Sequence, residues 1–254
     1  GACQAFEWVL DRRPVDDALD EAATEAAARL LELYDEGGRE DQAIALRRTL
    51  ADLSADPAVA RDLLLAAARG LRDRAPGDAW PLLDRLLASN PGDAQAIALS
   101  REVATATDDA VRMEAALSAE LGIASDDAVR APVLRERAAL RLAAGDPTGA
   151  FDDVRALLAM DPTDPVAWEV GSTLLDDASV GRDAATLLDG LADPARPDVR
   201  IPLLQARARF ASDDAERIPV LQDLGQALMS TGRPSEAVDV LVPVFLDEPA
   251  DDAR

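Results

Sequence analysis

The sequence contains no histidine, no lysine and a single cysteine, Cys3. Without histidine there is no Ser-His-Asp triad, no Cys-His pair and no histidine-ligated zinc. Without lysine there is no P-loop lysine and no Schiff base. One cysteine permits neither an internal disulfide nor a cysteine cluster. No glycine-rich phosphate loop or nucleophile elbow is present either. We therefore expect no enzyme, with no catalytic, cofactor-binding or metal-ligating residues.

Positive charge is scarce. All 26 basic residues are arginine, against 49 Asp and Glu, which gives a formal net charge of −23. This charge repels phosphate backbones, so nucleic acid is not an expected partner. No run approaches about 18 consecutive apolar residues, so no membrane span is expected. The lysine-free, alanine- and arginine-rich composition is typical of a bacterial protein encoded by a GC-rich genome.

No signal peptide is visible, which favours a cytoplasmic location. The opening Gly-Ala-Cys resembles the tail of a lipobox, so a periplasmic or lipid-anchored location stays open if an upstream signal was removed. The apolar segment from Ala5 to Leu10 follows Cys3 at once without a tether, which argues against lipidation.

The dominant pattern is helical. Strong helix formers, with apolar residues three and four positions apart, fill residues 21–34 and 60–73. Runs of β-branched residues with alternating polarity are absent. Glycine and proline interrupt the pattern at short intervals, as at Asn90-Pro91 and Asp161-Pro162. This rhythm predicts an all-α protein of helical hairpins with no β-sheet.

An internal repeat supports this prediction. Residues 124–134 read ASDDAVRAPVL and residues 211–221 read ASDDAERIPVL, an offset of 87 residues. The offset holds without gaps to the end of the chain, with 15 of 44 aligned positions identical. Gly145 aligns with Gly232, and Pro162 with Pro249. Identities gather at expected caps and turns, where backbone geometry restricts the choice of residue.

The two copies resemble the tetratricopeptide repeat (TPR) family. Segments 145–164 and 232–251 are similar to the second half of that repeat, because glycine precedes a small alanine by five residues and proline follows that alanine by twelve. The large–large–small–large pattern of the family's first helix is carried by Leu221, Leu224, Gly225 and Leu228. Trp168 stands where the family often places tryptophan.

This resemblance implies a right-handed α-solenoid of antiparallel helix pairs, about six hairpins in all. The clearest repeats are 128–162 and 215–249, degenerate repeats are 20–55 and 58–91, and 93–123 and 165–212 match poorly. An additional helix near 198–211 would account for the long offset. We expect residues 1–254 to be one array, an excerpt of a longer one, since no polar capping helix is visible.

The resemblance also implies a non-catalytic scaffold that binds a protein or peptide in a concave groove lined by the first helix of each pair. Candidate groove residues, placed by their spacing before the turn glycines, are Glu32, Asp35, Arg135, Leu142, Gln222, Gln226 and Met229. Clamping of a chaperone carboxylate tail is disfavoured, because the chain has no lysine and one asparagine. The alternative is a structural subunit that self-assembles by stacking its uncapped terminal helices.

An arginine stripe departs from the TPR pattern. Arg130, Arg137 and Arg141 are spaced to share one side of a helix, and the last two align with Leu224 and Leu228. One interpretation is structural, with the arginines paired to nearby aspartates, for example Arg130 to Asp126. The other is a site for an acidic partner segment. We favour the structural interpretation.

Two other groups of residues have two interpretations each. Paired aspartates occur at 108–109, 126–127, 176–177, 213–214 and 251–252, and none has the spacing of a calcium loop, so we expect them to cap helices. The sparse large aromatics are expected to fill gaps between helices, with exposed anchors for a partner as the minority interpretation. They are Trp8, Tyr34, Trp80, Phe151 and Trp168.

Overall fold

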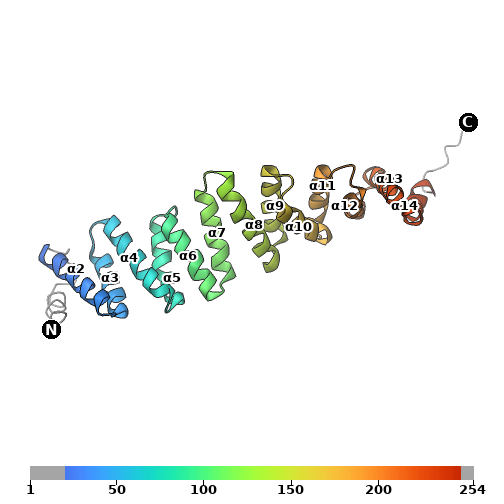
Figure 1. Cartoon of the computed structure of the whole chain (residues 1–254). Helices are drawn as coiled ribbons and strands as arrows, with labels where there is room; N and C mark the ends of the chain where they lie inside the picture. The colour runs from blue at the N-terminus through green and yellow to red at the C-terminus, as the bar shows by residue number, and fades with distance from the viewer. Residues whose placement is uncertain (1–20, 247–254) are drawn as a thin grey trace, which may run out of the picture. The chain divides into compact units, whose positions relative to one another are not determined.

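The computed structural model describes residues 21–246, with side chains from residue 25 to residue 242. The described residues form thirteen α-helices and two short 3-10 helices, and no strand (Figure 1). The predicted all-α fold class is therefore confirmed. Contacts divide the chain into two compact units, of which unit 1 ends at Ala124 and unit 2 begins at Ser125. That residues 1–254 act as a single array stays a prediction.

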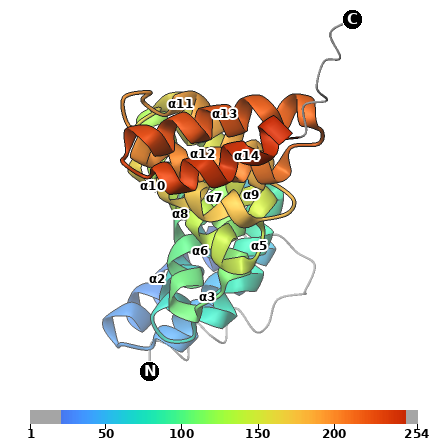
Figure 2. The ribbon, with the colours of Figure 1, turned by 90° about the vertical axis from the view of Figure 1, so that its right-hand side faces the viewer.

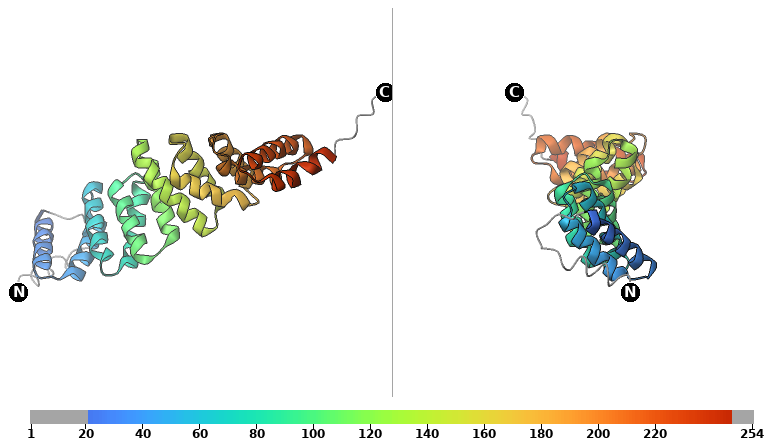
Figure 3. Two further views of the ribbon diagram at one scale, coloured as in Figure 1. Left: turned by 45° about the vertical axis from the view of Figure 1, so that its right-hand side comes forward. Right: turned by 90° about the vertical axis from the view of Figure 1, so that its left-hand side faces the viewer.

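Unit 1 is a series of helices in which each packs on the next (Figure 3, blue to green). They are α2 (Glu21–Glu36), α3 (Glu40–Leu53), α4 (Pro57–Arg72), η1 (Pro76–Ala79), α5 (Trp80–Ser89), α6 (Ala94–Thr107) and α7 (Ala110–Ile123). The first two hairpins coincide with the degenerate repeats at 20–55 and 58–91. A third hairpin, α6 with α7, occupies 93–123, where the sequence matched the repeat poorly.

Unit 2 contains the two clearest repeats. Its elements are α8 (Asp127–Ala144), α9 (Pro147–Met160), α10 (Pro165–Thr173), η2 (Leu174–Asp176), α11 (Gly181–Leu191), α12 (Pro197–Phe210), α13 (Asp214–Ser230) and α14 (Pro234–Leu246). The pairs α8–α9 and α13–α14 coincide with repeats 128–162 and 215–249, and Figure 2 shows α13 and α14 side by side. The chain thus has a TPR-like repeat fold.

Three helices, not two, separate α9 from α13. The third is α12, which packs on α11 before it and on α13 after it. It is the additional helix expected near 198–211, and it accounts for the 87-residue offset. Arg182 at the start of α11 pairs with Glu216 near the start of α13 at 2.6 Å. The starts of these two helices therefore lie close together, and α12 packs on both helices.

The helix α12 is built like α8 and α13. All three contain Arg-x-Pro followed by Val or Leu and then Leu, and in each the proline is the sixth residue of the helix: Pro132, Pro202 and Pro219. A proline supplies no N–H to the carbonyl four residues before it, so this site is best left facing solvent. All three prolines are exposed.

Aspartates start many helices, as predicted. The side chains of Asp93, Asp109, Asp126, Asp164 and Asp213 each accept a hydrogen bond from a backbone N–H two or three residues later. The other paired aspartates of the described residues do not cap the start of a helix. Asp127 and Asp214 are the first residues of α8 and α13, and Asp176 is the last residue of η2. Asp108 follows α6 in the left-handed region (φ 51°). Asp177 accepts hydrogen bonds from the N–H groups of Ser179 and Val180 in the loop before α11. The pair 251–252 lies outside the described residues.

Small residues allow the helices of a pair to approach closely. Ala150 of α9 is 0% exposed and Ala237 of α14 is 1% exposed. A Cβ on Gly225 of α13 would lie 2.7 Å from Cδ1 of Leu241 on α14. The predicted role of these small residues at helix crossings is thus confirmed. After α8 and α13, the chain turns at Gly145 (φ 77°) and Gly232 (φ 75°), which take the left-handed conformation that glycine tolerates.

Candidate functional site

A hollow of unit 2 lies between α10 and α12, and we call it the α10–α12 groove. Its volume is about 670 Å³. Residues of α10, η2 and α12 line it: Trp168, Ser172, Leu175, Asp176, Val199, Pro202, Leu203, Gln205 and Arg209. It is open to solvent along the exposed side of α12, where Pro202, Gln205 and Arg209 are all exposed.

Trp168 forms the apolar wall on the α10 side. The indole is half-buried, and its Nε1–H donates to the carbonyl of Pro162 at 2.8 Å. Since this hydrogen bond satisfies the only polar atom of the ring, the remaining surface of the indole is free for apolar contacts. Val199, Pro202 and Leu203 supply the apolar surface on the α12 side.

The start of α10 is fixed by Asp164. Its carboxylate caps the N–H of Ala167 at 2.9 Å, and its Oδ2 lies 2.7 Å from both Nε and an Nη of Arg135 on α8. Burial by itself raises the pKa of Asp164, but the hydrogen bonds from Arg135 and from the backbone outweigh burial and hold that pKa below its usual value. The orientation of Trp168, four residues later, thus depends on the carboxylate of Asp164, which caps α10 and pairs with Arg135.

The rotation of α12 is fixed by Asp189 of α11, which is buried. Arg200 donates to Oδ1 of Asp189 at 2.9 Å, and Arg207 donates to Oδ2 at 2.6 Å. The hydrogen bond with Asp189 raises the pKa of Arg200. Because two arginines seven residues apart hold one buried carboxylate, the opposite side of α12 faces the groove.

A polar end closes the groove at η2. Arg209 pairs with Asp176 at 2.7 Å and donates to the carbonyl of Leu175 at 3.2 Å. The guanidinium carbon of Arg209 also lies 5.2 Å from the ring centre of Phe210. Arg209 is thus held by three neighbours, whereas the carboxylate of Asp176 is 84% exposed.

The predicted groove residues do not gather in one place. Arg135 is engaged by Asp164, as described, and Leu142 is half-buried on α8. On α13, Gln222 and Gln226 are exposed, and Met229 is 57% exposed. Gln226 lines a second hollow of unit 2, about 440 Å³, with Arg200, Asp223 and the α11–α12 loop. Neither of these two hollows joins the α8 and α13 candidates.

The two candidates of unit 1 both pair with arginines. Asp35 forms an ion pair with Arg47 at 2.7 Å, and Glu32 pairs with Arg29 one turn earlier. Both carboxylates are at least half exposed. Nothing in these contacts favours a particular ligand.

The arginine stripe surrounds a buried carboxylate of α9. Arg137 donates to both oxygens of Asp153, at 3.0 and 2.6 Å, and Arg141 donates to Oδ2 at 3.2 Å. The side chain of Asp153 is 2% exposed. Asp126, the expected partner of Arg130, caps the N–H of Val129. These contacts fit a structural role for Arg137 and Arg141, which stays a prediction until tested.

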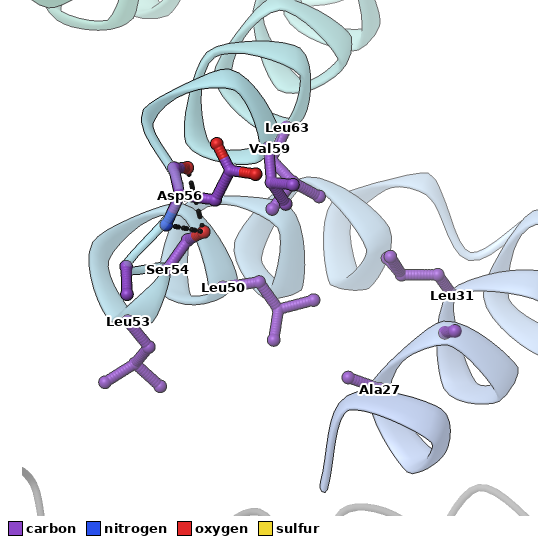
Figure 4. Close-up of a pocket in the computed structure, with 10 residues that line it drawn as sticks. Ala27, Leu31, Leu50, Leu53, Ser54, Asp56, Val59 and Leu63 are labelled. Carbon is purple, nitrogen blue, oxygen red and sulfur yellow. Dashed lines mark hydrogen bonds between the residues drawn. The ribbon is translucent and has the colours of Figure 1, made fainter. Parts of the chain in front are cut away.

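The main hollow of unit 1 is apolar. It has a volume of about 380 Å³ and lies among Leu31 of α2, Leu50 of α3, and Val59 and Leu63 of α4 (Figure 4). Ser54 and Asp56 at its edge hydrogen-bond each other through Oγ and backbone atoms. The side chain of Asp56 is used to cap Ala58. This hollow offers apolar surface but little that would orient a ligand.

The aromatic residues divide between the two interpretations. Tyr34 and Phe151 are buried, as expected of core residues, whereas Trp80 and Trp168 are half-buried. Trp8 lies outside the described residues. Within residues 21–246 no cluster of three or more potential metal ligands was found, and no helix is long and apolar enough to cross a membrane.

No protein-family model matches the chain, and no curated protein sequence matches it significantly. Solved structures similar to it include the following three. A tetratricopeptide repeat protein from Parabacteroides merdae ATCC 43184 is 11% identical, with 90% of this chain and 94% of that chain covered and a TM-score of 0.40. The TPR domain of P58(IPK) is 16% identical, with 90% and 75% covered and a TM-score of 0.32.

The third is BtubC (BKLC) from P. vanneervenii, 15% identical, with 100% of this chain and 91% of that chain covered and a TM-score of 0.25. Two of the three are described as TPR proteins. At these identities and TM-scores the likenesses say nothing of what this chain does. Its function has to be argued from its own surfaces.

Proposed function

We propose that this protein is a non-catalytic scaffold that binds a protein or peptide segment, and that the α10–α12 groove receives that segment. The observation that carries the proposal is the groove itself, an open hollow of about 670 Å³ with a tryptophan in its wall. Tryptophans in such walls often dominate the energy of protein interfaces.

The construction of the groove supports this proposal. Two buried carboxylates fix the walls of the groove. Asp164 pairs with Arg135 at the start of α10, which carries Trp168, and Asp189 pairs with Arg200 and Arg207 of α12. A binding surface that is fixed before the partner arrives loses less conformational entropy on binding. The groove also uses α10, a first helix directly after a Pro-x-Asp turn, which is the helix type that the TPR resemblance assigns to binding.

The test compares Trp168→Ala with the wild-type protein in affinity purification from a cell lysate. The wild type should retain a partner for which Trp168→Ala has an affinity lower by at least about thirtyfold, since removing an interface tryptophan costs roughly 2 kcal/mol or more. Trp80→Ala is the matched control, because Trp80 is also half-buried but lies in unit 1 and stacks with Arg112 at 4.7 Å. Equal retention by all three proteins would contradict the role of the groove.

The second candidate function is self-assembly by stacking. One observation favours it: Val238 and Val242, one turn apart on α14, are 56% and 45% exposed. In the aligned copy, Val238 corresponds to Phe151 of α9, which is buried beside α10. Light scattering over a range of concentrations tests this candidate. Growth of the wild type that Val238→Glu abolishes would favour stacking, and a constant monomer mass would exclude it.

A further inference from the structure

The residues that line the α10–α12 groove indicate the chemistry of the segment that it binds. This inference rests on the function proposed above. The groove has an apolar part, formed by Trp168, Val199, Pro202 and Leu203, and a charged end formed by Asp176 and Arg209. A ligand that fills it must therefore bring an apolar side chain and a polar or charged group close together.

The charged end favours a cation over an anion. Arg209, whose side chain is 51% exposed, already contacts Asp176, the Leu175 carbonyl and the Phe210 ring, so its guanidinium has partners within the protein. Asp176 is 84% exposed, and the ion pair with Arg209 occupies only one side of its carboxylate. A second cation can approach the open oxygen of Asp176 without breaking that pair.

The surroundings of the groove add to this preference. Helix α10 carries one charged residue, Glu169, which follows Trp168 and is exposed. Two of the three arginines of α12, Arg200 and Arg207, point away from the groove to Asp189. The whole chain has a net charge of −23. This field attracts cationic segments and repels acidic ones before contact is made.

We infer that the α10–α12 groove binds a partner segment in which a large apolar side chain stands next to lysine or arginine. The apolar side chain packs between Trp168 and the α12 wall, and the cation pairs with Asp176. The partner is thus a protein with a basic–apolar segment.

The experiment uses the full chain and three short fluorescein-labelled peptides, each with leucines flanked by lysines, by glutamates or by glutamines. Fluorescence anisotropy should show that the lysine peptide binds most tightly. Its affinity should fall when salt is raised from about 0.05 M to about 0.5 M, because screening weakens contacts between exposed charges. Trp168→Ala should weaken binding at least about thirtyfold, as expected of an interface anchor.

The variant Asp176→Lys tests the charge preference. This variant should bind the lysine peptide more weakly and the glutamate peptide more tightly, each by roughly fivefold or more. The substitution removes one charged contact at the rim of the interface and reverses its sign. The control is Asp239→Lys on α14, which changes the net charge equally at another exposed carboxylate. A similar effect of both substitutions would overturn the contact with Asp176.

The outcomes separate this inference from the function on which it rests. If the glutamate or glutamine peptide binds best and Trp168→Ala still abolishes binding, the groove is a peptide site and the charge preference is wrong. If no peptide binding depends on Trp168, both the inference and the groove function fail. A circular dichroism spectrum of each variant verifies that it is folded.

Discussion

Arg61 of α4 reaches the aspartate that caps α6, so one repeat is tied to the start of the next. Its Nε lies 2.5 Å from Oδ2 of Asp93, and one of its Nη atoms lies 3.0 Å from Oδ1. Asp93 also accepts hydrogen bonds from the N–H groups of Gln95 and Ala96. Unit 2 uses the same arrangement, with Arg135 of α8 and Asp164 at the start of α10.

The first prediction concerns this carboxylate in unit 1. Asp93→Ala should lower the free energy of unfolding by about 2–3 kcal/mol, because it removes a helix cap and leaves Arg61 without its main partner. Asp93→Asn, which can still cap the helix, should cost less. Urea unfolding followed by circular dichroism measures both. The control is Asp62→Asn, since Asp62 also pairs with Arg61 but is 71% exposed; a comparable loss there would contradict the role of Asp93.

The second prediction concerns pH. The hydrogen bond from Arg61 holds the pKa of Asp93 below its usual value, and the pKa of Asp164 is lowered as well. For a carboxylate with a lower pKa in the folded state, the stabilisation is complete above the unfolded pKa of about 3.9 and is lost as pH falls through the folded pKa. The melting temperature should therefore fall steeply below about pH 4. The double variant Asp93→Asn, Asp164→Asn should melt lower near neutral pH and show a shallower acid slope; an unchanged slope would refute the assignment.

The third prediction concerns close approach of helices. Ala237→Leu forces a larger side chain into the crossing of α13 and α14, where Ala237 is 1% exposed. Overpacking of this kind should cost about 1–3 kcal/mol. Glu236→Leu places the same leucine side chain at the neighbouring exposed position, where only the surface pair with Arg233 is lost. Thermal melts should therefore separate the two variants, and equal melting temperatures would show that the register of α14 is wrong.

The fourth prediction concerns the arginine stripe. Arg137→Leu should destabilise the protein by about 3 kcal/mol, because it leaves the buried carboxylate of Asp153 with a poorer partner. Arg141→Leu, which removes the longer contact, should cost less. Arg155→Leu on the same α8–α9 pair is the control, since Arg155 is 64% exposed and pairs with Asp152 at the surface. Peptide binding should not change in any of them; loss of binding at full stability would favour the acidic-partner interpretation instead.

Much of the fold could be predicted because it depends on local rules. Asp126 and Asp213, Gly145 and Gly232, and Ala150 and Ala237 occupy positions where backbone geometry or a tight crossing restricts the residue type. Such positions are visible in a single sequence once it is compared with itself. The additional helix was also signalled, since Arg200-Ile201-Pro202 of α12 matches Arg217-Ile218-Pro219 of α13.

The site was harder to predict because it depends on which sides of distant helices meet. Trp168 was noticed, but as a family position and a core residue. Gln205 and Arg209 were not singled out, because α12 lies outside the repeat template. Spacing before a turn glycine cannot show that Arg135 is already engaged by Asp164, twenty-nine residues away. The repeated Arg-x-Pro motif was the one sequence pattern that could have indicated the groove, because it places Pro202 on the solvent-exposed side of α12.

The additional helix has a consequence for symmetry. Three helices, α10, α11 and α12, lie between the two copies, whereas an array built only of hairpins places an even number of helices between corresponding pairs. In a chain whose successive helices alternate in direction, an odd number reverses the second copy relative to the first. We therefore expect a side chain duplicated in α8 and α13 to meet different surroundings in the two copies, so that the two surfaces can diverge independently.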